Sequence, residues 1–290
     1  MRVTESRMME LAAQAVSDAM SKSASTGQIV ASGIKVALPS DDPAAWAAGM
    51  RAQARKTLST FRSSAIGSAQ ERLTTSENAL SSMSSILSQV KVLGVQAGND
   101  TLSASDRSTL AAQTQGLQQS LLSLLNTQDA SGQYVFAGTA GDTAAFDATG
   151  AFVGNAVDRV VQVGEGHTQG VSVSGSALTA ASGVDVYATV NALATAMANN
   201  DSAGVRAQLD NMNKAISQVA GASGTAGIKL KALRDADTSR LELEQNLDQR
   251  TSNALAADPT TAASDFTNAK NALDAAQLLA QQIVNLTTPH

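Results

Sequence analysis

Small and apolar residues recur near both ends of this chain in alternating steps of three and four. This is the spacing of a helix that packs against a partner helix. The members of the two stripes, which we expect to form an assembly interface, are Met9, Ala12, Val16 and Ala19 near one end and Phe266, Leu273, Ala276, Ala280 and Ile283 near the other. Both stripes hold few large apolar groups, so neither helix should be stable alone. We expect the two helices to lie side by side and to leave apolar surface that other helices cover.

The strongest periodicity runs from Ile66 to Ala97 and predicts a long helix. A helix of the same spacing is expected from Leu110 to about Thr127, after a polar loop and a capping signal at Ser103. Because the loop between them is short, these two helices should form an antiparallel hairpin.

Strand-like segments follow this hairpin. Gln133–Gly138 alternates in the manner of a strand, and so do Val157–Val163 and Val171–Val173 on either side of a loop at Gly164–Gly170. We therefore expect a small β-rich insertion at this point in the chain.

Helical patterns return after the insertion, at 184–197 and 205–219. A cluster of glycines at Gly221–Gly227 predicts a turn, and a long charged helix should follow it from 228 to 255. Asp258-Pro259 should end that helix and lead into the last one.

The order of these segments predicts a mainly α fold with a small β-rich insertion. The N- and C-terminal halves should pair as an elongated antiparallel helical bundle or coiled coil, since neither half holds a core of its own. We expect three parts: residues 1–38 with 259–290 as terminal helices, 39–130 with 184–258 as a long-helix bundle, and 131–183 as the β-rich outer insertion.

A corner separates the first two helices and carries a complete helix-start signal. Gly33 precedes it, and Pro39 stops any helix that arrives from the N-terminal side. Asp42 should cap the next helix, with Pro43 at its first position and Asp41 also near its positive end. A catalytic role for the two carboxylates is disfavoured, because adjacent residues of an extended chain point to opposite sides.

Composition excludes several classes of function. The net charge of −5 and the isoelectric point near 5.0 argue against a nucleic-acid partner. The chain has no cysteine, which excludes disulfides and thiolate chemistry. Its first residues lack the apolar run of a cleaved signal peptide, and no segment is apolar enough for membrane insertion.

Candidate catalytic and metal-binding residues are scarce. His167 stands in a glycine-rich loop without a neighbour at metal-ligand spacing, and His290 is the last residue. Gly164-Glu165-Gly166 has the wrong glycine spacing for a phosphate loop and lacks its lysine. We therefore expect no catalytic, cofactor or metal site. A soluble enzyme or binding protein with a β-rich site domain is the alternative from another class, and the sequence offers no residues for it.

Several motifs are similar to those of the flagellin superfamily and, within it, of the bacterial flagellar hook-associated protein 3 family, the hook–filament junction proteins. They are Met1-Arg2-Val3-Thr4, Ser32–Val36, Pro39–Ala45, Leu102–Arg107, and the run that contains Tyr134, Phe136 and Gly138. The last run separates this family from flagellin itself. The resemblance covers most of the chain and is weakest in the insertion. It fails at the end of the chain, where Pro289 cannot extend a helix and an aromatic residue is missing.

The resemblance implies a structural protein of the bacterial flagellum, exported without a cleaved signal. It implies a ring of subunits that polymerise through their helices, with the first hook-associated protein, flagellin and a flagellar export chaperone as partners. The resemblance implies that the terminal helices pair in an inner tube. We expect these helices to be disordered in the monomer and to fold on assembly. A flagellin-type filament subunit is the alternative.

Overall fold

The computed structural model describes residues 2–287 and consists of two compact units. One unit, here unit 1, contains the chain up to Leu58 together with the chain from Leu243 on. The other, unit 2, is Ser59–Glu242. Two long helices, α2 (Pro43–Ala97) and α5 (Ser202–Leu255), contribute to both units. Pro289 lies outside the described residues.

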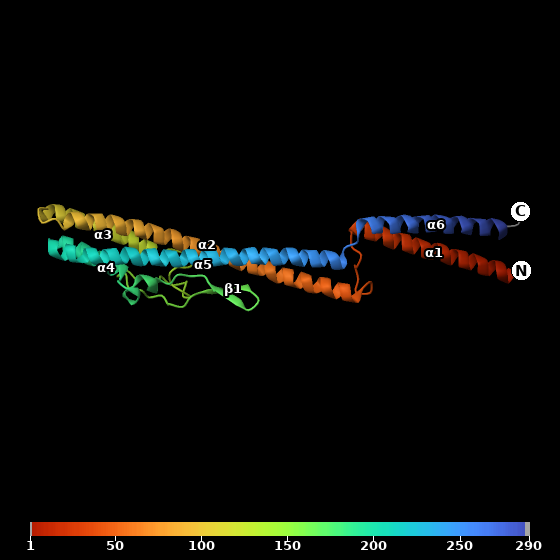
Figure 1. Cartoon of the computed structure of the whole chain (residues 1–290), viewed down its shortest axis with the longest axis horizontal. Helices are drawn as coiled ribbons and strands as arrows, with labels where there is room; N and C mark the ends of the chain where they lie inside the picture. Colours follow the sequence, from red (N-terminus) through yellow and green to blue (C-terminus); the bar gives the residue numbers. More distant parts are fainter. Residues whose placement is uncertain (1, 288–290) are drawn as a thin grey trace. The chain divides into compact units, whose positions relative to one another are not determined.

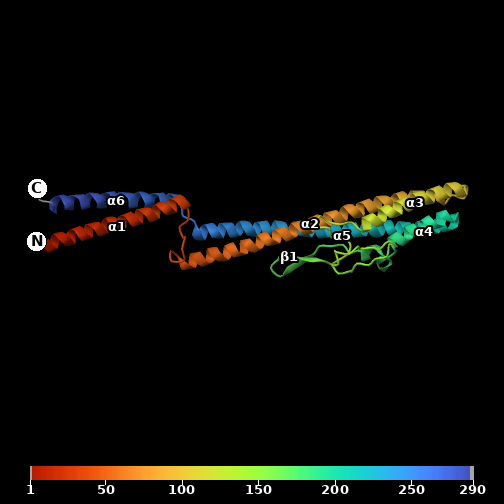
Figure 2. The ribbon, with the colours of Figure 1, turned by 180° about the vertical axis from the view of Figure 1, so that it is seen from behind.

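Unit 1 is built on two helices that run along each other, α1 (Arg2–Ser32) and α6 (Pro259–Thr287). They are antiparallel, since α1 begins at the end of the pair where α6 finishes (Figures 1 and 2). The first turns of α2 and the last turns of α5 complete the unit. The predicted pairing of the terminal helices is therefore confirmed.

Unit 2 is an antiparallel bundle that contains most of α2 and α5 together with α3 (Ala104–Leu125) and α4 (Val186–Ala198). The stripe read from the sequence of α2 is buried at all ten positions, namely Ile66, Ala69, Leu73, Ser76, Leu80, Met83, Leu87, Val90, Gly94 and Ala97. Steps of three and four keep these residues on one face of the helix, where the other helices cover them.

The predicted stripe of α3, namely Leu110, Thr114, Leu117, Leu121 and Leu124, is buried only in part. Thr114 and Leu121 are buried, whereas Leu110, Leu117 and Leu124 are half-buried and the covered face also includes the polar residue Gln118. Thr114 donates to the Leu110 carbonyl and Gln118 donates to Asn191 of α4. Because these polar groups have partners within the bundle, they can be buried on the covered face of the helix.

The insertion contains less β-structure than the sequence predicts. Its only regular strands among the described residues are β1 (Val160–Gly164) and β2 (His167–Gly170), which pair antiparallel, followed by the short 3-10 helices η1 (Gly175–Leu178) and η2 (Ala180–Ser182). The second strand thus occupies the segment expected as a loop.

Two further strand predictions in the insertion are wrong. The segment expected as a strand at Val171–Val173 follows β2 as irregular chain, and Gln133–Gly138 forms turns with a single bridge between Gln128 and Tyr134. Buried apolar side chains such as Val135 and Phe136 give these segments a strand-like pattern without a neighbouring strand.

The predicted turn at Gly221–Gly227 is wrong, because α5 continues through it as one helix. Ala222, Ala226 and Leu230 are buried along this stretch. A helical glycine costs about 1 kcal/mol relative to alanine, and burial of the opposite face of α5 outweighs that cost. The mainly α architecture with a small β-rich insertion is otherwise confirmed. The three-part division stays a prediction.

Candidate assembly site

The residues expected at the assembly interface lie within the α1–α6 pair. Ala12, Val16 and Ala19 of α1 are half-buried, and so are the five expected residues of α6, while Met9 is more exposed. Farther along, Phe266 packs against α1 at Gly27, where a β-carbon would lie 3.2 Å from the phenyl ring. The two stripes therefore face each other within one chain, and their use between subunits stays a prediction.

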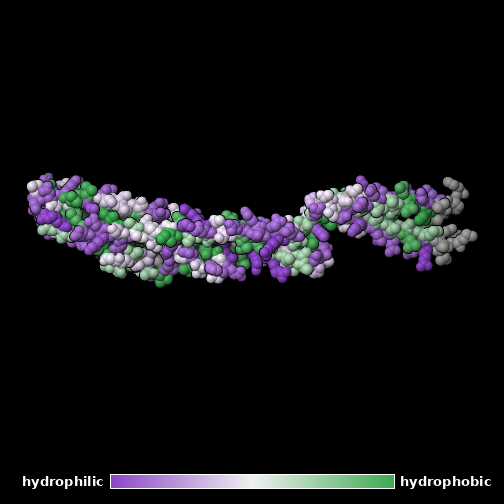
Figure 3. Space-filling model, viewed as in Figure 1, coloured by the Kyte–Doolittle hydropathy of each residue, from purple (hydrophilic) through white to green (hydrophobic). Residues whose placement is uncertain are grey.

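A second set of apolar side chains on the same helices remains uncovered. Leu11 and Met20 of α1 are 61% and 63% exposed, and Leu278 and Leu279 of α6 are 61% and 60% exposed. Figure 3 shows hydrophobic residues gathered on the half of the pair that lies away from the corner. Large apolar side chains left exposed in such number, on more than one face of the pair, indicate that partners cover these helices.

Leu278 shows why the sequence reading missed this set. At 3.6 residues per turn it lies about 160° around α6 from Ala276, which belongs to the stripe. The three-four rule selects one face of a helix and passes over a second one. Adjacent apolar residues such as Leu278-Leu279 were the available signal.

The start of α2 is capped as predicted. Asp42 Oδ1 accepts hydrogen bonds from the backbone N–H groups of Ala44 at 3.0 Å and Ala45 at 2.9 Å, and Pro43 is the first helical residue. Asp41 does not cap the helix. Its Oδ2 accepts hydrogen bonds from the N–H groups of Ala37 and Leu38 and so closes the turn before Pro39.

The start of α6 has the same Asp-Pro cap as the start of α2. Asp258 Oδ1 accepts from the N–H of Thr261 at 2.8 Å, and Pro259 takes the first helical position. Hydrogen bonds from the backbone and hydroxyl of Thr261 lower the pKa of Asp258, so its carboxylate form is favoured. Both segments that connect a terminal helix to a long helix thus lead into an Asp-Pro start.

The two connecting segments are bound to each other. The N–H groups of Lys35 and Val36 donate to the Leu255 carbonyl at 2.8 and 3.2 Å, and Ala257 donates to the Gly33 carbonyl at 2.9 Å. Val36 is only 4% exposed. Gly33 ends α1 with a φ of +68°, a conformation that glycine adopts without strain. The corner is therefore a joint made by two segments of chain, of which the sequence identified one.

In unit 2, a buried arginine fixes the insertion to α2. Arg72 donates to Asp129 at 2.5 Å and to the Tyr134 carbonyl at 2.7 Å. Burial and the nearby Arg159 lower the pKa of Arg72. Burial raises the pKa of Asp129, but hydrogen bonds from Ser131 and Gln133 and the charge of Arg72 outweigh it and leave the pKa lowered.

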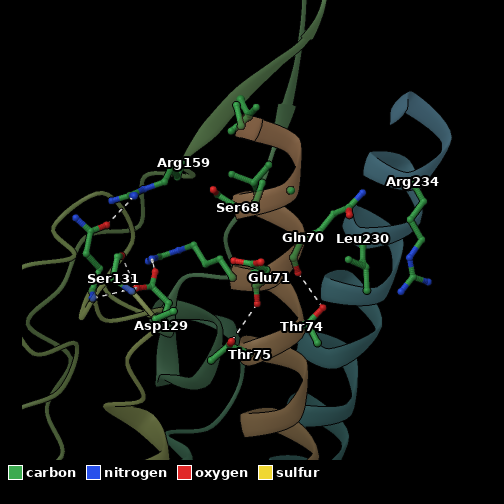
Figure 4. A pocket seen from close by; sticks show the side chains of 18 residues that line it. Ser68, Gln70, Glu71, Thr74, Thr75, Asp129, Ser131, Arg159, Leu230 and Arg234 are labelled. Atoms are coloured by element: carbon green, nitrogen blue, oxygen red, sulfur yellow. Dashed lines mark hydrogen bonds and ion pairs between the residues drawn. The ribbon is translucent and has the colours of Figure 1, made fainter. Parts of the chain in front are cut away.

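This ion pair borders an open groove of about 1100 Å³. In Figure 4, Asp129 and Ser131 line one side, Leu230 and Arg234 of α5 line the other, and Glu71 of α2 lies between them. The lining groups mostly bond to one another, and this gives the groove a structural role in holding the insertion.

The family motif in the insertion has a structural role as well. Phe136 is fully buried, and its carbonyl accepts from the N–H of Gly175. Gly138 has a φ of +67°, and a β-carbon there would clash with the Asn155 carbonyl oxygen. Only glycine fits at that position.

The residues considered for chemistry are dispersed. His167 is exposed, with its Nδ1 2.9 Å from the Glu165 carbonyl oxygen. Within residues 2–287, no three His, Cys, Asp or Glu side chains gather in a way that could hold a metal ion. No helix in that part of the chain has both the length and the apolarity to cross a bilayer.

The sequence of this chain is similar to those of known flagellar proteins. The family described as bacterial flagellin N-terminal helical region matches residues 4–141. Flagellar hook-associated protein 3 of Salmonella typhimurium is 32% identical over 178 residues, which are 61% of this chain and 56% of that protein. The same protein of Escherichia coli is 32% identical over 160 residues, 54% of this chain and 50% of its own length. The matches thus span about half the length of these relatives.

Solved structures share the fold. A protein of Vibrio parahaemolyticus, provisionally described as a flagellar hook-associated protein, is 27% identical with a TM-score of 0.68, over 74% of this chain and all of the other. FlgL of Xanthomonas campestris has a TM-score of 0.61 at 19% identity, over 70% of this chain and 99% of its own.

Proposed function

Because residues 4–141 match the flagellin N-terminal region and the chain is similar to flagellar hook-associated protein 3, we propose that it is a structural adaptor that joins the flagellar hook to the flagellin filament. The observation that carries this proposal is that both terminal helices leave large apolar side chains uncovered, Leu11 and Met20 on α1 and Leu278 and Leu279 on α6. In an adaptor these side chains are covered by neighbouring subunits, and burial of such side chains stabilises the assembly by about 1.5–3 kcal/mol each.

The partners follow from the same proposal. Copies of the chain form a short ring, which contacts the first hook-associated protein on one side and flagellin on the other. The chain is exported to the flagellum, and an export chaperone holds α6 until then. Catalysis has no part in this function, which depends on contacts between helices.

Deletion of the gene tests the adaptor. The expected result is hooks without filaments, with flagellin released into the medium and both defects restored by the intact gene. Cells that build normal filaments without the gene would contradict the proposal.

A flagellin-type filament subunit is the second candidate, favoured by the match of residues 4–141 to the flagellin N-terminal region. Polymerisation of the purified chain separates the two. Long filaments made of this chain alone support a filament subunit, whereas addition only to hook ends or to flagellin seeds supports the adaptor.

A further inference from the structure

The start of α2 carries an unusual charge pattern. From Pro43 to Gln70 the helix has four basic residues, Arg51, Arg55, Lys56 and Arg62, and no acidic one. Lys56 is paired with Asp248 at 2.6 Å. Arg51 and Arg55 are exposed, and neither forms an ion pair with another described residue.

Arg51, Arg55 and Leu58 lie on one face of α2, because they are spaced by four and then three residues. Leu58 is 54% exposed. We call these three residues the arginine face. It presents two cations beside an apolar side chain, and its complement is a surface with carboxylates beside an apolar group.

The insertion has the opposite charge. Residues 131–183 contain four acidic side chains and one basic one. Asp147 is held by Thr149 and Ala151, and Asp158 pairs with Lys229. Asp142 and Glu165 are exposed and form no ion pair within the described chain.

Glu165 lies at the tip of the β1–β2 hairpin, in the two-residue turn that it forms with Gly166. Figure 1 shows this hairpin extending from the helices of unit 2. The hairpin also carries Val160, which is 60% exposed. A carboxylate and an apolar side chain thus lie on one projecting element.

We infer that the arginine face of one copy binds the β1–β2 hairpin of a neighbouring copy, with Arg51 and Arg55 facing Glu165 and Leu58 facing Val160. Two different surfaces that complement each other form a head-to-tail contact, which closes into a ring when the rotation between copies allows it. This inference rests on the proposed function, since it describes how copies in the ring meet.

Disulfide cross-linking tests the contact. Because the chain has no cysteine of its own, only the introduced cysteines of the two variants can form a disulfide between copies. Cells that make both Arg55→Cys and Glu165→Cys chains are treated with a mild oxidant, and their isolated flagella are examined. The expected result is a disulfide between the two variants. In the matched control, Lys214→Cys replaces Arg55→Cys. Lys214 is exposed on a helix, as Arg55 is, but it belongs to unit 2 and should give no cross-link with Glu165→Cys.

Charge exchange is the second measurement. Arg51→Glu with Arg55→Glu should reduce incorporation into flagella at least tenfold, and co-expression with Glu165→Lys should restore it. Reduced incorporation without any Arg55–Glu165 cross-link would point to another acidic protein as the partner and would overturn the inference.

Absence of the chain from isolated flagella is a separate result, because it contradicts the proposed function and leaves the contact itself to be tested elsewhere. The same cysteine pair is in that case mixed as purified full chains at low ionic strength, where charge attraction is least screened. Cross-linking no greater than in the Lys214→Cys control would overturn the inference there.

Discussion

Gly49 lies directly against the side chain of Leu255, so that a β-carbon on Gly49 would come within 2.7 Å of Leu255 Cδ1. The contact joins the first turns of α2 to the last residue of α5 in unit 1. The carbonyl of the same Leu255 accepts the hydrogen bonds of Lys35 and Val36. One residue thus connects the helix packing to the paired segments of the corner.

Replacing Gly49 by alanine should weaken this corner. The added methyl group forces Leu255 aside, and overpacking of this kind costs about 1–3 kcal/mol. Hydrogen exchange should therefore accelerate at the amides of Val36 and Ala257, which are bonded across the joint.

Gly67→Ala is the matched control, since Gly67 lies in α2 with open space around it. It should stabilise the helix by about 0.5–1 kcal/mol and leave the corner amides unchanged. Equal protection of Val36 and Ala257 in the two variants would contradict the role given to Gly49.

Arg72→Met should destabilise unit 2 by about 3–5 kcal/mol, because it leaves Asp129 without its buried partner. Chemical denaturation measures this change in the free energy of unfolding. Arg234→Met removes an exposed arginine from the same groove and should change that free energy by less than about 0.5 kcal/mol. Similar losses in both variants would show that Arg72 does not hold the insertion.

Acid should destabilise unit 2. The pKa of Asp129 is lowered in the folded chain, so its carboxylate contributes stability that is present above the unfolded pKa of about 3.9 and is lost as the pH falls through the folded value. The free energy of unfolding should therefore decrease below about pH 4. Asp129→Asn should be less stable than the natural chain at pH 7 and approach it in acid. A difference that stays constant from pH 7 to pH 3 would rule out this linkage.

Leu278→Asp should impair assembly more than folding. Leu278 is exposed in the single chain, so a carboxylate there costs little until a neighbour covers it. Motility and the amount of the chain in isolated flagella should fall at least tenfold, while the melting of the purified chain stays the same. Gln277→Asp adds the same charge to an exposed neighbour and serves as the control. Full motility of the Leu278→Asp strain would argue against this surface.

Hydrogen exchange on dilute monomer examines whether the terminal helices fold on assembly. Residues 1–30 and 262–286 should exchange rapidly, because their thin stripes bury little apolar surface against each other. Protection in these segments as strong as that of Leu80 and Met83, which are fully buried in unit 2, would count against this prediction.

Local sequence was most informative where one face of a helix is buried. Steps of three and four identified the covered face of α2 from Ile66 to Ala97, since helix geometry converts that spacing directly into a stripe. The helix start at Asp42 and Pro43 was also predicted correctly, because a capping side chain bonds to backbone groups only two or three positions away.

The burial of Arg72 and the helical conformation of Gly224 could not be predicted from local sequence. An arginine within a helical pattern is ordinarily assigned to solvent, and only the arrival of Asp129 and Tyr134 from the insertion allows Arg72 to be buried. Gly224 suggests a turn, but α5 continues through it because its neighbours Ala222 and Ala226 are covered by other elements.

The sequence by itself determined most of the helical segments, the caps at the starts of two of them, and the thin stripes at the two ends of the chain. These features depend on residues within a few positions of one another. Tertiary structure decided that Phe266 packs on Gly27, that Leu278 stays exposed, and that Gly33 and Leu255 belong to one joint. Such relationships join residues more than 200 positions apart, and no local spacing records them.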